Sequence, residues 1–122
     1  MKSTPITASV PARPENILPI RLFVSGIATR AGFDINLIND VKTAVSEACV
    51  MVISCAAHGE MHLHAQIEDG LAIRIAYEGE TKQPDANVNE FSTMIIEAMA
   101  DDVKIETSEK GISVTMNFVA GD

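Results

Sequence analysis

The sequence predicts an α+β fold, a two-layer α/β sandwich in which one mixed, mostly antiparallel sheet carries about three helices on one face. Segments from about residue 18 to 56 and from 90 to 100 repeat apolar residues at helical spacing. Segments 61–77 and 103–119 alternate apolar and polar residues around a turn, which is the pattern of antiparallel strand pairs. With a short strand in front, the element order is β-α-α-β-β-α-β-β. The 122 residues are enough for one core, so residues 1–122 are expected to form a single domain.

The first expected elements are an edge strand and a helix. Ile6–Val10 is short and β-prone, and the prolines that follow it end the strand. A helix should begin near Leu18, because Pro19 fits a first helical turn, and it should end at Gly32. The inward residues predicted from the spacing are Ile20, Phe23, Val24, Ile27 and Ala28.

The second helix is expected to run through the middle of the domain, because its second half is apolar nearly all round. Asp34 can cap its start, and His58-Gly59 ends it. Cys49 and Cys55 lie about 240° apart around the axis, so they cannot bridge and are expected to be buried thiols in a reducing compartment. The predicted apolar face consists of Ile38, Val41, Val45, Ala48, Cys49, Val52, Ile53 and Ala56.

Two strand pairs and a third helix complete the predicted fold. Asp69-Gly70 forms the first hairpin turn. The helix should span about Glu90 to Ala100 with Phe91, Met94, Ile95 and Ala98 inward, and the second pair is Val103–Thr107 with Ile112–Val119. The buried face of the first pair consists of Met61, Leu63, Ala65, Ile67, Leu71, Ile73, Ile75 and Tyr77.

Composition and charge limit the function. A net charge of −8 opposes a phosphate backbone, so nucleic-acid binding is not expected, whereas basic surfaces of a protein partner would be attracted. The start of the chain lacks the apolar segment of a signal peptide, and no apolar run is long enough to span a membrane. The expectation is therefore a soluble, cytoplasmic protein.

No metal site is predicted. His62 and His64 share one face of a predicted strand, a spacing that a metal site can use, but Glu68 is too far along to be an obvious third ligand. The favoured interpretation is a solvent-facing strand that carries incidental histidines.

Three stretches, in order, resemble one known family. Within the second helix, Val45-Ser46-Glu47-Ala48-Cys49-Val50-Met51 is similar to a box in which a helix carries a glutamate and, four residues later, an asparagine. Residues 19–33 and 98–105 are similar to the family's first helix and to its last helix-to-strand junction. These stretches resemble the histidine-kinase-like (Bergerat) ATPases, and especially the anti-sigma factor serine kinases of bacteria. The resemblance covers roughly residues 4 to 119 and implies the Bergerat fold.

In that family the glutamate of this box is the general base and the asparagine carries Mg²⁺ to the ATP phosphates. The resemblance assigns the first position to Glu47. Met51 stands where the asparagine would be, and its thioether is a poor ligand for a hard cation. Glu47 is therefore either a vestigial catalytic residue or a structural glutamate, partly exposed or hydrogen-bonded at the rim of the former pocket.

The family's first glycine box, whose aspartate hydrogen-bonds the adenine amino group, falls on Tyr77-Glu78-Gly79-Glu80-Thr81. Only Gly79 matches, since Tyr77 replaces the aspartate and Thr81 the second glycine. An unpaired adenine amine would cost about 1–3 kcal/mol, and the phenol would occupy room that the base needs. Tyr77 is expected to fill the pocket as a core residue.

The second glycine box, which opens the family's last helix and grips the phosphates, falls on Glu90-Phe91-Ser92-Thr93. Both glycines are missing, so the backbone cannot approach phosphates closely, and Glu90 adds a repelling carboxylate. The lid between the boxes is shortened to about ten residues. A degenerate nucleotide pocket is therefore expected, lined by Met51, Tyr77, Gly79, Thr81, Phe91 and Ser92.

The favoured hypothesis is a pseudokinase. Such a protein would be an anti-sigma regulatory factor that binds a sigma factor or an anti-sigma-antagonist domain without ATP hydrolysis and so regulates transcription. The resemblance implies a homodimer and places Arg21 near an arginine that contacts both partners, although Arg21 is equally interpretable as a plain surface residue. No cofactor is expected.

Two alternatives stay open. One is an active ATP-dependent serine/threonine protein kinase that uses Glu47, ATP and Mg²⁺ at an atypical site. The other is a cleft re-used for a different small ligand, with Tyr77 and Met51 in its wall.

Overall fold

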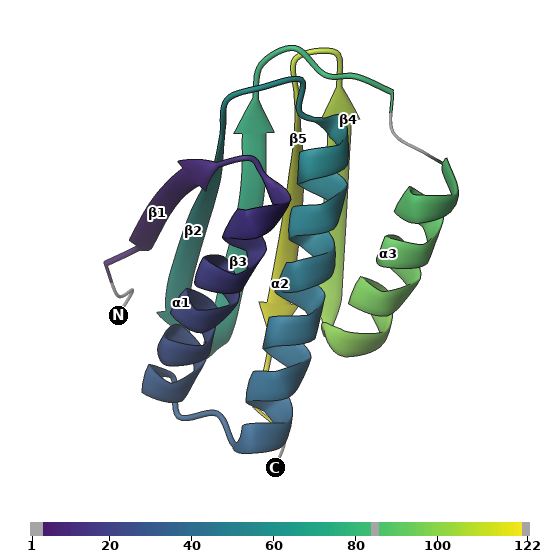
Figure 1. Ribbon diagram of the computed structural model, residues 1–122. Helices are drawn as coiled ribbons and strands as arrows, with labels where there is room; N and C mark the ends of the chain where they lie inside the picture. The colour runs from purple at the N-terminus through teal and green to yellow at the C-terminus, as the bar shows by residue number, and fades with distance from the viewer. Residues whose placement is uncertain (1–3, 84–85, 121–122) are drawn as a thin grey trace.

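A computed structural model describes residues 4–83 and 86–120, with the side chains of residues 86–88 excepted. Five strands form one sheet in the order β1-β2-β3-β5-β4 (Figure 1). The strands are β1 (Ile6–Pro11), β2 (Glu60–Glu68), β3 (Gly70–Glu78), β4 (Asp102–Ser108) and β5 (Gly111–Phe118). A short 3₁₀ helix (Pro14–Asn16) precedes the helices α1 (Ile17–Arg30), α2 (Ile35–Cys55) and α3 (Ala86–Met99).

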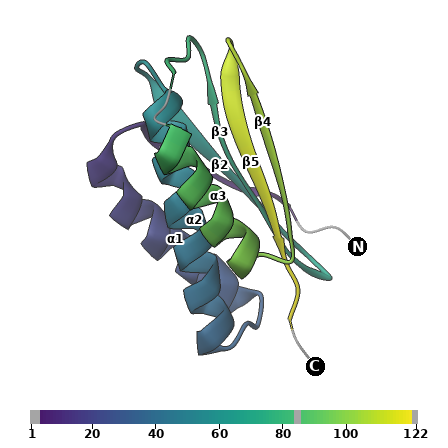
Figure 2. The same ribbon diagram turned by 90° about the vertical axis from the view of Figure 1, so that its right-hand side faces the viewer.

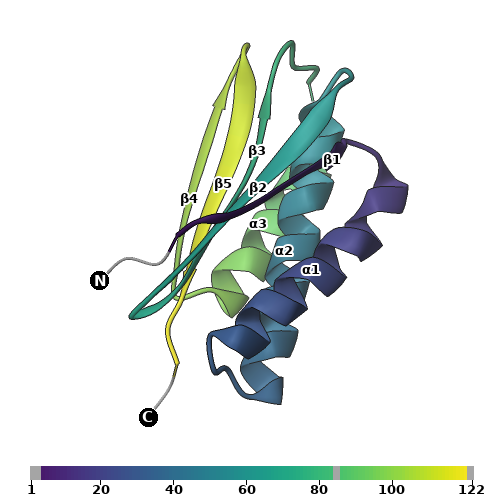
Figure 3. The ribbon, with the colours of Figure 1, turned by 90° about the vertical axis from the view of Figure 1, so that its left-hand side faces the viewer.

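The helices form one layer and the sheet the other, as predicted (Figure 2). The expectation of a mixed sheet is corrected, because every pairing between the described strands is antiparallel. The reason is the last hairpin, which places β4 at the sheet edge and returns β5 antiparallel beside β3. At the other edge lies β1, as its prolines predicted (Figure 3).

α2 is the central helix of the layer and packs against α1, α3 and the sheet (Figure 1). The Asp34 carboxylate caps it by accepting a hydrogen bond of 2.9 Å from the Leu37 amide, as predicted. Both cysteines are free and buried, and burial raises the pKa of the Cys49 thiol to about 12. The predicted central position of this helix is confirmed.

α1 buries Ile20, Val24, Ile27 and Ala28 as predicted, but the inward placement of Phe23 is wrong. Phe23 is 36% exposed. Its position lies roughly 40° beyond the arc that the buried residues cover, so the ring sits at the margin of the core rather than in it.

α3 differs most from its prediction. It begins at Ala86 rather than near Glu90, and it turns Phe91, Met94 and Ala98 to solvent. Ser92 and Ile96 are buried instead. A buried serine hydroxyl needs a hydrogen-bond partner, and Ser92 has one on α2 that the sequence pattern could not reveal.

The predicted alternation of β2 and β3 is confirmed, except that Ile67 is only half-buried. His62 and His64 lie on the sheet face away from the helices, and the Ser9 hydroxyl lies 2.7 Å from His62 Nδ1. Across the described residues, no three histidine, cysteine, aspartate or glutamate side chains gather where they could hold a metal ion. None of the described helices is both long and apolar enough to span a membrane.

Candidate functional site

Glu47 lies near the middle of α2, half-buried at the contact with α3. Its carboxylate accepts a hydrogen bond of 2.9 Å from the hydroxyl of Ser92, which is 1% exposed. A hydrogen bond thus directly connects Glu47, the predicted catalytic position, with Ser92, a predicted pocket residue. One carboxylate oxygen of Glu47 is therefore engaged by a side chain of the same protein.

Met51 lies one turn further along α2 and is 2% exposed. The Thr93 hydroxyl lies 4.0 Å from the Met51 sulfur and donates to the Asn89 carbonyl at 2.8 Å. Position 51 is therefore an apolar contact between two helices. A thioether in this place offers no oxygen or nitrogen ligand.

Tyr77 fills the space at the end of β3. Its side chain is 2% exposed, and its hydroxyl donates a hydrogen bond of 2.6 Å to the Glu80 carbonyl. Its predicted burial is confirmed, and Glu78 faces the opposite, exposed side of the strand.

The ring of Tyr77 also explains why a glycine follows at position 79. Gly79 has a φ of +149°, and a Cβ atom placed there would lie 2.7 Å from the Tyr77 hydroxyl oxygen. The glycine that matches the family's box thus makes room for a side chain of this protein.

Thr81 ties the loop after β3 to the neighbouring hairpin. Its hydroxyl donates to the Ser108 carbonyl at 3.0 Å, and the next amide, of Lys82, donates to the Cys55 carbonyl at 2.8 Å. The loop is therefore fastened to both the end of α2 and the turn between β4 and β5. The backbone freedom that a second glycine would give this loop is absent.

The segment Glu90-Phe91-Ser92-Thr93 lies inside α3 rather than at its start. Its amides are beyond the first turn, so they are used by the helix's own hydrogen bonds. Phe91 is 64% exposed on the outer side of the helix. Phe91 faces outward because α3 is oriented with the neighbouring Ser92 toward α2.

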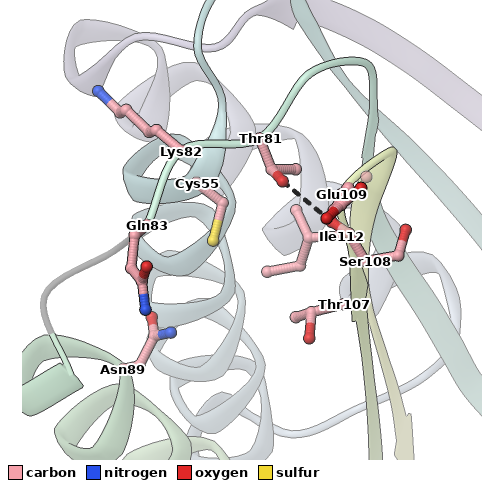
Figure 4. A pocket seen from close by; sticks show the side chains of 10 residues that line it. Cys55, Thr81, Lys82, Gln83, Asn89, Thr107, Ser108, Glu109 and Ile112 are labelled. Carbon is pink, nitrogen blue, oxygen red and sulfur yellow. Dashed lines mark hydrogen bonds between the residues drawn. The ribbon is translucent and has the colours of Figure 1, made fainter.

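A cavity of about 420 Å³ lies between the end of α2, the loop after β3 and the β4–β5 hairpin (Figure 4). Of the predicted pocket residues only Thr81 lines it; Met51 and Tyr77 do not. No sequence pattern indicates this cavity, because its walls come from four segments that share no motif: the end of α2, the loop after β3, the first half of α3 and the β4–β5 hairpin. Asn89 Oδ1, on its wall, is buried without a hydrogen-bond partner in the described part of the chain. The lining residues are Cys55, Thr81, Lys82, Gln83, Asn89, Thr107, Ser108, Glu109, Gly111 and Ile112.

Arg21 belongs to α1, which lies on the opposite side of α2 from α3 (Figure 1). Its side chain is half-exposed and forms no ion pair with any described residue. Leu18 and Leu22 beside it are 62% and 61% exposed. α1 therefore presents an apolar surface next to a guanidinium that has no partner within residues 4–83 and 86–120.

The antiparallel sheet and the layer of three helices on one of its faces form a two-layer α+β sandwich. The chain matches the histidine kinase-like ATPase domain over residues 10–118 and belongs to that family.

Among its relatives is the serine-protein kinase RsbW of Listeria monocytogenes, which is 36% identical over an alignment 133 residues long that covers 91% of this chain and 84% of the relative. RsbW of Bacillus subtilis is 32% identical, and the alignment covers 91% of this chain and 82% of the relative. A solved structure of the RsbU and RsbW domains of Rv1364c from Mycobacterium tuberculosis has a TM-score of 0.76 at 14% identity. That match covers 96% of this chain and 32% of the other, and it extends to the fold alone.

Proposed function

We propose that this protein is an anti-sigma regulatory factor that binds a sigma factor or an anti-sigma-antagonist domain without hydrolysing ATP. The observation that carries the proposal is the hydrogen bond from Ser92 to Glu47 beside the buried Met51. The general base of the family is held by the protein's own α3, and the metal position is an apolar helix contact. The relatives named serine-protein kinase RsbW support a place in this regulatory class.

The residues at the nucleotide positions do not fit Mg·ATP. The family resemblance aligns Tyr77 with the adenine-binding aspartate, and the Tyr77 hydroxyl is already bonded to the Glu80 carbonyl. The amides of residues 90–93 lie within a helix and cannot grip phosphates. Exposed Glu90 adds a carboxylate to the same segment. Catalysis by phosphoryl transfer depends on positioning and charge stabilisation, and this set of residues supplies neither.

The partner is proposed to dock on α1. The exposed Leu18 and Leu22 supply apolar contact area, and Arg21 supplies a charged group that no described residue pairs with. Arginine is one of the residue types enriched at binding hot spots, so Arg21 is expected to carry most of the binding energy of this surface. The homodimer implied by the family resemblance stays a prediction.

The second candidate is an active serine/threonine kinase. Two observations favour it: Glu47 is retained and half-exposed, and the relatives carry the name of kinases. In this case α3 would have to release Glu47 before ATP could enter.

Binding measurements with purified partners test the proposal. Sigma factors and antagonist domains from the same genome are titrated against the protein with and without Mg·ATP. We expect one of them to bind equally well in both conditions, with no phosphoserine detected by mass spectrometry. Arg21→Glu should weaken this binding at least about tenfold, because it removes a hot-spot cation and introduces repulsion.

The matched control is Arg30→Glu, which makes the same charge change at an exposed position of the same helix. Equal loss in both variants would remove Arg21 from the proposed face. A phosphorylated antagonist would favour the kinase instead.

A further inference from the structure

α3 presents an apolar stripe to solvent, formed by Phe91, Met94 and Ala98. These positions are spaced i, i+3 and i+7, so they fall within about 60° of the helix circumference. Phe91 is 64% exposed and Met94 63%. α3 is the outer helix of its layer, and no described element lies on its far side (Figures 1 and 2). Large apolar side chains gathered in this way are typical of interaction sites.

The charged side chains that α3 carries beside its apolar stripe are all acidic. Glu90 and Glu97 are exposed and lie roughly 40–60° from Met94 around the helix. Residues 86–99 contain no lysine, arginine or histidine. Neither carboxylate takes part in an ion pair with another described residue. The helix therefore combines an apolar strip with an unbalanced negative edge.

We propose that the apolar stripe of α3 is a docking surface for a basic amphipathic helix of a partner protein. Such a helix buries apolar side chains at the same i, i+3, i+7 spacing and places lysine or arginine against Glu90 and Glu97. A second copy of this chain fits less well, because two identical stripes would bring like charges together in a protein of net charge −8. The inference rests on the proposed function in that the chain acts by binding a protein. It uses a surface on the opposite side of α2 from α1.

The test uses two synthetic amphipathic peptides that share a leucine face at helical spacing and carry either lysine or glutamate elsewhere. Binding is followed by fluorescence anisotropy, and the site is mapped by amide chemical shifts of the labelled protein. We expect the lysine peptide to bind, the glutamate peptide not to bind, and the shifts to fall on α3. The variant Phe91→Ser/Met94→Ser should lower the affinity about tenfold or more. Both side chains are largely exposed, so its melting temperature should match the wild type.

Two matched controls separate docking from general attraction to an acidic protein. Ile35→Ser removes another exposed apolar side chain and should leave the affinity unchanged. Glu97→Lys should weaken binding, whereas Glu109→Lys, the same change on the exposed β4–β5 turn, should not.

Three results would overturn the proposal. These are no binding of the lysine peptide, equal binding to the stripe variant, or equal loss with Glu109→Lys. The proposal would also be overturned if the protein self-associates in sedimentation experiments and the Phe91→Ser/Met94→Ser variant does not. A second copy of the chain would then occupy the stripe. If the peptide fails while a partner still binds through Arg21, the docking surface is wrong and the proposed function stands.

Discussion

Replacing Tyr77 with alanine is expected to lower the free energy of unfolding by about 3–5 kcal/mol, the range for removing a buried aromatic side chain. The ring is 2% exposed and packs over Gly79, so its removal leaves a cavity at the end of β3. The Glu80 carbonyl would also lose the hydroxyl that it accepts from. Urea denaturation, followed by circular dichroism, measures the change.

Tyr77→Phe is the matched control, because it keeps the ring and removes only the hydroxyl. It should cost about 1 kcal/mol, the usual net value of one hydrogen bond. If Tyr77→Ala costs no more than Tyr77→Phe, the ring does not fill the pocket, and room for a ligand would exist beside Gly79.

Replacing Met51 with asparagine, the residue of the family's box, is expected to destabilise the protein by about 2–5 kcal/mol rather than to restore a metal site. The change removes a buried thioether and places an amide at a buried helix contact, where the Thr93 hydroxyl lies 4.0 Å from the present sulfur. The Thr93 hydroxyl already donates to Asn89. Urea denaturation measures the loss, and titration with Mg²⁺ should show no binding.

Met51→Leu controls for the change of side chain, since a volume-conserving apolar substitution costs less than about 1.5 kcal/mol. Wild-type stability of Met51→Asn would contradict the description of position 51 as a closed helix contact. It would mean instead that solvent reaches this part of α2.

The sequence was sufficient to predict α2 and the first strand pair, because the signals that define these elements are local. Asp34 caps the helix through an amide three residues away, and the alternation around Asp69-Gly70 fixes which side chains face the helices. Tyr77 could be placed in the core for the same reason, since it continues the buried face of β3.

The sequence was insufficient to predict which face of α3 is buried, because the orientation of this helix depends on a residue far away in the chain. Ser92 is buried through its bond to Glu47, a residue 45 positions away. An apolar pattern alone favours burying Phe91 and Met94, and it carries no information on which hydroxyl will find a carboxylate. Because Ser92 is buried, its neighbour Phe91 faces outward, contrary to the prediction from the apolar pattern.

Nor could the sequence reveal the cavity beside Thr81. Cys55, Asn89 and Thr107 meet only because the end of α2, the start of α3 and the β4–β5 hairpin converge in the folded chain. None of these residues belongs to a motif. The family resemblance pointed to Tyr77 and Met51, which are packed inside the protein and leave this space to other residues.

Isothermal titration calorimetry with Mg·ATP tests the absence of a working nucleotide site most directly. RsbW of Listeria monocytogenes, titrated in parallel, serves as the positive control. Because Glu47 is bonded to Ser92 and Met51 and Tyr77 are buried, we expect no heat of binding for this protein up to millimolar nucleotide. A dissociation constant in the micromolar range, equivalent to a binding free energy of about −8 kcal/mol, would contradict the proposed loss of ATP binding and favour an active kinase.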